Sequence, residues 1–199
     1  MGWVWPEAGV EGGPSVVAPG VRPLVASDVG ALQAFLSGLS YGARYFRFGR
    51  GDIVLAADQL YALCTPDPRE GASYGAFVTD RTRADMVGLA GYCVGGEPRA
   101  CEFALVVADA WQGRGIGRRL IATLADDARR RGLRRLTGRV LASNRRMLDC
   151  ARRFGFRVEP WDGSAVVMRV TLALVPTLPP IGAAAQPPVV PAQVGDSHG

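Results

Sequence analysis

The sequence VVADAWQGRGIGRRL, Val106 to Leu120, joins an apolar run to an arginine-bearing helical pattern through three closely spaced glycines. These glycines are Gly113, Gly115 and Gly117. Backbone N–H groups at a helix N-terminus are unpaired, and the helix dipole places about half a positive charge there. Glycine has no Cβ that would keep a ligand away. The stretch therefore predicts a strand, an anion-binding turn suited to a pyrophosphate, and a helix.

The glycines allow two other interpretations. A dinucleotide-binding fold has G-x-G-x-x-G near the start of its domain and an acidic residue about 20 positions later. Here the spacing is G-x-G-x-G, it lies past the middle of the chain, and the next apolar segment (residues 134–140) has no acidic residue. We therefore do not expect NAD binding. A tight strand-to-helix turn without a ligand remains the alternative.

Apolar periodicity extends the pattern on both sides of the turn. Residues 99–109 are mostly apolar and predict a central strand. The helix that follows is expected to end at Gly132, with the ion pairs Asp126–Arg130 and Asp127–Arg131 on its outer face. Its buried stripe is predicted to consist of Ile116, Leu120, Leu124 and Ala128.

The remaining segments complete an α/β domain with a mixed sheet. Strands are predicted at residues 21–25, 73–80, 85–95, 99–109, 134–141 and 164–174. A first helix should begin at Ser27, residues 43–48 are helical or irregular, and a later helix should run from Ser143 or Asn144 to Gly155. A polar turn at 80–84 would join two antiparallel strands. The segments 99–109, 116–131 and 134–141 predict a parallel strand–helix–strand crossover.

Composition places this domain between two tails. Residues 1–20 are rich in Gly, Pro and Val and are expected to be a flexible leader, and residues 21–175 form the domain. Residues 176–199 hold six prolines and are expected to be a disordered Pro/Ala-rich tail. The sequence has no run of eighteen apolar residues and no secretory signal pattern, so we expect a cytoplasmic protein without a membrane partner. No feature indicates an oligomeric state.

The scarcity of histidine and the absence of lysine restrict the catalytic and metal-binding chemistry expected of this chain. The single histidine, His198, is next to the last residue, and all 23 basic residues are arginine. Histidine-based triads, histidine metal sites, Walker-type phosphate loops and Schiff-base chemistry are therefore not expected, and no metal is predicted. The four cysteines are widely spaced, which favours reduced, packed thiols over disulfides or a zinc site.

The net charge of +5 is concentrated in one region. Eleven arginines lie between Arg129 and Arg157, and a phosphate backbone could meet such a cluster. Few aromatic residues are interleaved with it and the same helices carry acids, so nucleic-acid binding is not expected as the main function.

Two motifs together resemble those of the GNAT acyltransferase superfamily. QGRGIG at 112–117 is similar to its Q/R-x-x-G-x-G/A signature, and SNRRM at 143–147 with RFGF at 153–156 is similar to its second motif. The resemblance covers residues 20–173. It implies a mostly antiparallel mixed sheet, splayed where an acyl-CoA binds, and acetyl-CoA as cosubstrate.

The resemblance also implies a role for each matching position. Leu105, Val106 and Val107 would form a bulged strand end that holds the pantetheine, and Asn144 would hydrogen-bond that arm. The pyrophosphate would contact residues 112–117. The implied contacts are Gln112, Gly113, Arg114, Gly115, Ile116, Gly117 and Arg118, and some of Arg118, Arg145, Arg146 and Arg152 would reach the 3′-phosphate.

Transfer of an acetyl group to an amine requires a base, because an amine of pKa about 10 is mostly protonated at pH 7. Glu102 is the only acid inside the predicted central strand, and burial there would raise its pKa. It lies about 13 Å along the strand from Val106, at roughly 3.3 Å per residue, so it would act through water. The alternative is a structural glutamate that is paired with an arginine and has no catalytic role.

The context ACEFALVV resembles the catalytic domain of bacterial protein-lysine acetyltransferases, in which a glutamate on this strand is the base. The looser match at 37–50 supports the same family, whereas residues 60–72 depart from it. This resemblance implies lysine side chains of proteins as acceptors. Small amines such as an amino acid, polyamine or antibiotic remain the alternative, followed by a non-catalytic acyl-CoA sensor.

One position departs from the family pattern. Many GNAT enzymes place a tyrosine four residues before the glycine of GF, where it protonates the leaving thiolate, and this chain has Ala151 there. Cys150 is a poor substitute. Water, Tyr74, Tyr92 or Ser143 are the remaining candidates.

Overall fold

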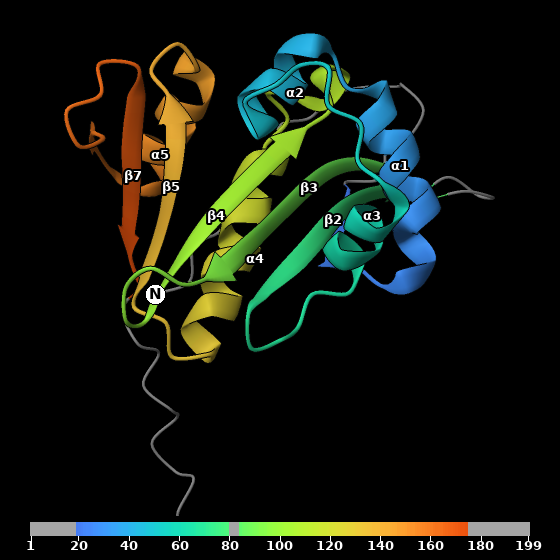
Figure 1. Ribbon diagram of the computed structural model, residues 1–199, viewed down its shortest axis with the longest axis horizontal. Coiled ribbons are helices and arrows are strands. Elements are labelled where there is room, and N and C mark those ends of the chain that lie inside the picture. Colours follow the sequence, from blue (N-terminus) through green and yellow to red (C-terminus); the bar gives the residue numbers. More distant parts are fainter. Residues whose placement is uncertain (1–18, 80–83, 175–199) are drawn as a thin grey trace, which may run out of the picture.

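The computed structural model describes residues 19–79 and 84–174 (Figure 1). The strands are β1 Gly20–Pro23, β2 Gly71–Thr79, β3 Ala84–Val94, β4 Ala100–Val107, β5 Arg135–Leu141, β6 Arg157–Pro160 and β7 Val167–Ala173. The helices are α1 Val29–Gly38, α2 Tyr41–Phe48, α3 Ala57–Cys64, α4 Ile116–Arg130 and α5 Arg145–Phe154. Short 3₁₀ turns at Ala26–Asp28 and Asp109–Trp111 precede α1 and follow β4.

The described strands form one seven-stranded sheet in the order β1-β2-β3-β4-β5-β7-β6. β4 is the middle strand, as the apolar run predicted. β4 and β5 pair in parallel and are joined through α4, and the other pairings of the described strands are antiparallel. The predicted mixed sheet with a parallel crossover is therefore confirmed.

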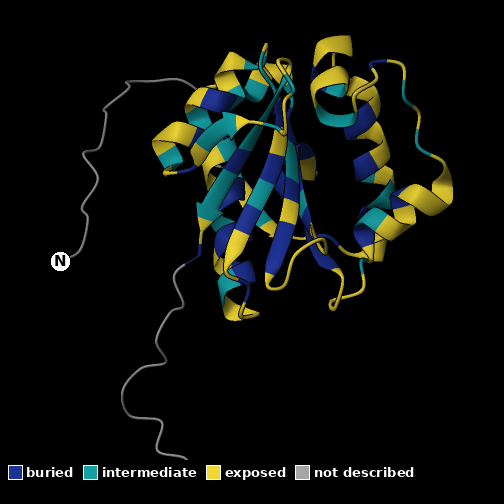
Figure 2. Ribbon diagram, turned by 60° about the vertical axis from the view of Figure 1, so that its left-hand side comes forward, coloured by how far each residue is buried: buried dark blue, intermediate teal, exposed yellow. Residues whose placement is uncertain are grey.

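Helices cover both faces of the sheet. One apolar cluster packs α4 and α5 against it and includes the predicted stripe of Ile116, Leu120, Leu124 and Ala128. A second cluster joins α1 and α3 to the opposite face through Phe77, Leu89 and Val106. Figure 2 shows the buried residues along the strands between these layers. Since Val106 and Val107 belong to different clusters, successive β4 side chains serve opposite faces.

Several local predictions needed correction. The first α-helix is capped by Asp28 rather than Ser27, because Ser27 lies inside the preceding 3₁₀ turn. Helix α3 and strand β6 were not predicted. The expected leader up to residue 18, the turn at 80–83 and the tail from 176 lie outside the described residues.

The cysteines are all free, as predicted, but they differ in exposure. Cys64 and Cys101 are buried, Cys150 is half-buried and Cys93 is exposed. Burial raises the pKa of Cys101 to about 12, so this thiol stays protonated at neutral pH. The prediction of packed thiols therefore fails for Cys93.

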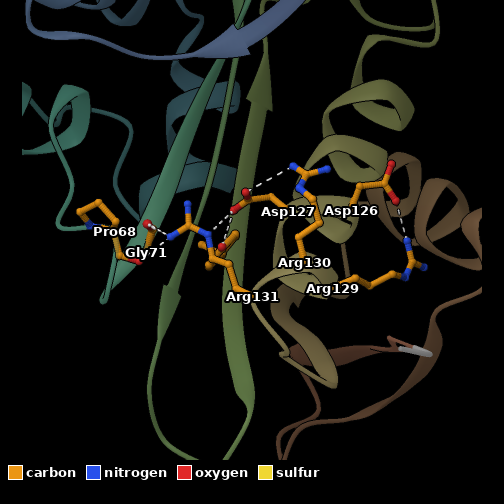
Figure 3. A network of polar contacts seen from close by, with 8 residues as sticks. Pro68, Gly71, Asp126, Asp127, Arg129, Arg130 and Arg131 are labelled. Carbon is orange, nitrogen blue, oxygen red and sulfur yellow. Dashed lines mark hydrogen bonds and ion pairs between the residues drawn. The ribbon is translucent and has the colours of Figure 1, made fainter. Parts of the chain in front are cut away.

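Of the two predicted ion pairs at the end of α4, Asp127–Arg131 is present at 2.9 Å, whereas Asp126 pairs with Arg129 instead of Arg130 (Figure 3). Asp127 is only 7% exposed, and it accepts a hydrogen bond from the Tyr92 hydroxyl at 2.5 Å. Arg130 and Arg131 both pair with it, and Arg131 also donates to the carbonyls of Pro68 and Gly71. Burial, followed by the bond to Asp127, raises the pKa of Tyr92 well above its ordinary value. The network therefore ties α4 to β3 and to the start of β2.

We expect Asp127→Ala to lower the free energy of unfolding by about 1–3 kcal/mol, because it leaves the buried Tyr92 hydroxyl without its acceptor and removes the carboxylate that pairs with Arg131. Asp126→Ala is the matched control, since Asp126 is 62% exposed and pairs only with Arg129 at 2.8 Å. It should cost less than about 1 kcal/mol. Urea unfolding of both variants measures the difference, and equal losses would contradict the assigned role of Asp127.

Candidate active site

Strands β4 and β5 pair only at their first three residues. Their parallel register begins with Ala100 opposite Arg135 and ends with Glu102 opposite Thr137. β4 then continues to Val107 and β5 to Leu141, and the two strands diverge, as Figure 1 shows. A cleft of about 920 Å³ lies at this divergence. The β5-facing backbone edge of β4 beyond Glu102 has no partner strand among the described residues.

The glycine turn forms one wall of the cleft. Gly113 and Gly115 have φ values of +78° and +80°, in the left-handed region that side chains disfavour. Gly115 is also the N-cap of α4. No protein atom lies within 4 Å of a Cβ built at either glycine, so their surroundings are open. The helix N-terminus is therefore open at this point, as an anion site would require, and the binding of an anion there stays a prediction.

Gln112 connects the turn to its neighbours. Its Nε2 donates to the Val107 carbonyl at 3.1 Å, and its Oε1 accepts from Arg146 at 3.1 Å. Asn144 caps α5, since its Oδ1 accepts the Met147 N–H at 3.2 Å. Both side chains thus fix the backbone around the cleft.

Most of the predicted binding residues line this cleft. They are Leu105, Val106, Val107, Gln112, Gly113, Gly115, Gly117, Arg118 and Asn144. Two others do not. The side chain of Ile116 lies in the core under the sheet, and the Arg114 guanidinium lies 4.8 Å from the centre of the Trp111 ring.

The bulge implied for β4 is not found. β4 keeps one continuous register with β3 from Cys101 to Val107, and the register shift in this part of the sheet is in β2 between Ala76 and Phe77. The splay therefore results from the divergence of β5 rather than from an extra residue in β4.

The predicted burial of Glu102 is wrong. Its side chain is 47% exposed, and its Oε1 accepts from Arg139 Nε at 2.7 Å. The apolar neighbours Cys101 and Phe103 point to the opposite face, which is why the apolar run was misleading. Glu102 lies outside the cleft lining, whereas Arg139 is part of it. Its carboxylate is therefore near the rim, at the level where β4 and β5 separate.

Helix α2 forms a second wall that the sequence did not indicate. Gly42, Ala43, Phe46 and Arg47 line the cleft, and Ser40 does so at the helix N-cap. Asp109, just after β4, accepts hydrogen bonds from the Ser40 N–H and hydroxyl at 3.2 and 3.0 Å. Because Ser40 and α2 are more than sixty positions from the glycine turn, local patterns could not reveal the contact.

Comparison with known proteins identifies this arrangement. The family model described as "Acetyltransferase (GNAT) family" matches residues 45–156, which include Glu102, the glycine turn and Asn144. The chain belongs to the GNAT acetyltransferase family. It is therefore an enzyme that transfers acetyl groups.

Two similar proteins support the same assignment, and a third shares the fold. The acetyltransferase PA5475 of Pseudomonas aeruginosa is 34% identical over 155 residues, covering 76% of this chain and 83% of the relative. The GNAT domain of PAT from S. lividans has a TM-score of 0.70 at 25% identity, covering 78% of this chain and 90% of that one. A spermidine N-acetyltransferase from Vibrio cholerae, solved with CoA and spermine, has a TM-score of 0.62 at 17% identity, covering 79% and 96%. The last comparison bears on the fold alone.

The GNAT fold also narrows the candidates for protonating the leaving thiolate. Ala151 is fully buried under the sheet. Tyr74 and Tyr92 are core residues outside the cleft lining, so neither can reach a substrate there. Cys150 lines the cleft, and burial raises the pKa of its thiol. Ser143 is exposed but, like the tyrosines, is not part of the cleft lining, so water remains of the earlier candidates.

The arginine cluster of this GNAT domain is largely charge-compensated. Seven of its eleven members form ion pairs with acids, namely Arg129, Arg130, Arg131, Arg135, Arg139, Arg152 and Arg157. Arg146 and Arg153 line the cleft. This pairing weakens the case for a nucleic-acid surface.

Among residues 19–79 and 84–174, no helix is long and apolar enough to cross a membrane. The same part of the chain contains no group of three or more His, Cys, Asp or Glu that could hold a metal ion.

Proposed function

We propose that this enzyme transfers the acetyl group of acetyl-CoA directly to lysine ε-amines of protein substrates. The observation that carries the proposal is a cleft lined from both faces of the sheet, with the glycine turn on one side and α2 with Arg139 on the other. The resemblance of ACEFALVV to bacterial protein-lysine acetyltransferases favours a protein acceptor. Free cysteines fit a reducing cytoplasm, where we place the activity.

The residues present fit acetyl-CoA on one side of the cleft. The backbone N–H groups of Gly113, Gly115 and the first turn of α4 would hold the pyrophosphate. No protein atom occupies the space where a Cβ of either glycine would lie, so phosphate oxygens can approach the backbone there. The unpaired edge of β4 from Leu105 to Val107 offers backbone groups to the pantetheine as an added strand would. Arg118, Arg146 and Arg153 line the cleft on the same side and favour phosphate.

The acceptor would enter from the face of Glu102. We propose that this carboxylate takes a proton from the amine through water, since its Oε1 is engaged by Arg139 and the group lies at the rim. The amine nitrogen then forms a bond to the thioester carbonyl carbon, the carbon–sulfur bond breaks, and the sulfur receives a proton. Water is our proposed proton donor, since position 151 is alanine.

Isotope-labelled acetyl-CoA added to a cell lysate with the purified enzyme tests the acceptor class. Mass spectrometry should find label on protein lysines above a lysate blank. The chain itself contains no lysine, so a labelled lysine must come from a substrate. Label confined to small amines would instead support the small-molecule alternative and overturn the protein-lysine assignment.

A further inference from the structure

Arg47 of helix α2 is a partly buried cation with no counter-ion among the described residues. Its Nε is inaccessible and has no hydrogen-bond partner. Among the described residues its guanidinium forms no ion pair, and it stacks on the Phe48 ring at 4.7 Å. Burial lowers the pKa of Arg47, which reflects the cost of holding a charge away from water.

Arg47 lies on the face of the sheet from which the acceptor would enter. It lines the cleft, and its helix packs through Ala43 and Phe48 into the apolar cluster on the face opposite α4 and α5. Glu102 points to that same face, because its neighbours Cys101 and Phe103 belong to the other cluster. The phosphate-side arginines belong to α4 and α5, which cover the other face. Arg47 is therefore placed toward the acceptor rather than toward the coenzyme.

Two arginines of this face are paired with acids, whereas Arg44 of α2 also has a buried Nε without a hydrogen-bond partner but does not line the cleft. Arg139 pairs with Glu102, and Arg169 pairs with Asp162 at 2.9 Å. Arg47 has no equivalent acid, although it is held on a helix whose N-terminus is fixed to Asp109. A partly buried cation that lines a cleft is satisfied when a bound anion completes its pairing.

We propose that Arg47 binds a carboxylate of the acceptor, so that the enzyme selects amines that have a carboxylate close to them. This inference rests on the proposed function, under which the selected amines are lysines beside an aspartate or glutamate in the substrate protein. The α-carboxylate of a small amino acid has the same chemistry and is the other source to be distinguished. Charge-assisted pairing in a desolvated site gives the selection its strength.

Pairs of acceptors with and without a carboxylate measure how strongly the enzyme selects carboxylate-bearing amines. Peptides with one lysine carry Glu or Gln at each of the two positions on either side, and Nα-acetyl-lysine is compared with its methylamide. We expect wild type to prefer the carboxylate member of at least one pair about ten-fold in kcat/KM. Arg47→Gln should abolish the preference, and Arg47→Lys should retain part of it. Arg50→Gln, which removes an exposed charge beyond the same helix, is the control.

Calorimetry with acetyl-CoA and the melting temperature distinguish a loss of acceptor selection from a loss of coenzyme binding or of folding stability. Acetyl-CoA affinity and melting temperature should be unchanged in Arg47→Gln, because the lost side chain has no protein partner at Nε. A preference in the peptide pairs indicates an acidic sequence context, whereas one confined to Nα-acetyl-lysine indicates a free amino acid. Equal rates within every pair would overturn the carboxylate site while leaving lysine acetylation intact. Weakened acetyl-CoA binding would also overturn it, by assigning Arg47 to the coenzyme.

Discussion

Replacing Gly115 by leucine is expected to raise the KM for acetyl-CoA about ten- to a hundred-fold. Gly115 caps α4 with a φ of +80°, and no protein atom surrounds the position of its missing Cβ. A side chain there would occupy the space in which phosphate oxygens approach the N–H groups. Losing one or two charge-assisted hydrogen bonds has an effect of this size. Steady-state kinetics with acetyl-CoA as the varied substrate gives the value.

Gly132→Leu supplies the control at the other end of the same helix. Gly132 has a φ of +75° and equally open surroundings, so leucine strains its backbone in the same way. Both variants should lose comparable thermal stability, and only Gly115→Leu should bind acetyl-CoA weakly. An unchanged KM in Gly115→Leu would remove the pyrophosphate from this turn.

Glu102→Gln is expected to lower kcat about a hundred-fold at saturating acetyl-CoA, the scale at which a general base contributes. Glutamine keeps the size of the side chain and can still accept from Arg139, but it cannot take a proton. The loss should be greatest at low pH, where more of the amine is protonated. Turnover measured from pH 6 to 9 reveals the change.

The chain offers a closely matched control for that variant. Glu97 pairs with Arg135 of β5, much as Glu102 pairs with Arg139 of the same strand. Glu97→Gln should retain wild-type turnover, because its ion pair lies at the opposite end of β5 from the cleft. If Glu102→Gln also turned over normally across the pH range, Glu102 would be a structural partner of Arg139.

Local sequence patterns were sufficient where neighbouring residues along the chain decide the conformation. The stripe from Ile116 to Ala128 requires only helical periodicity, and the ends of α4 and α5 require only Gly132 and Gly155. The glycine turn is equally local, because positive φ at Gly113 and Gly115 follows from the residue type. The parallel crossover then follows from the order of its elements.

Sequence patterns gave wrong predictions where segments far apart in the chain form the surroundings of a side chain. Asp127 was expected at the surface, but Tyr92 of β3 covers it. Glu102 was expected to be buried by its apolar neighbours, but alternation along β4 directs them to the other face and leaves Glu102 with Arg139. Burial of a side chain depends on which strand or helix packs over it, and a linear sequence does not specify that.

The sequence by itself determined the GNAT architecture, the glycine turn and the absence of histidine and lysine chemistry, because each depends on residue type and short spacing. Only the tertiary structure decided which segments enclose the cleft. β5 diverges from β4 after Thr137, and α2 is held over the opening by Ser40 and Asp109. These contacts join segments tens of residues apart, and they place Arg47, a cation without an ion-pair partner among the described residues, on the side where the acceptor enters.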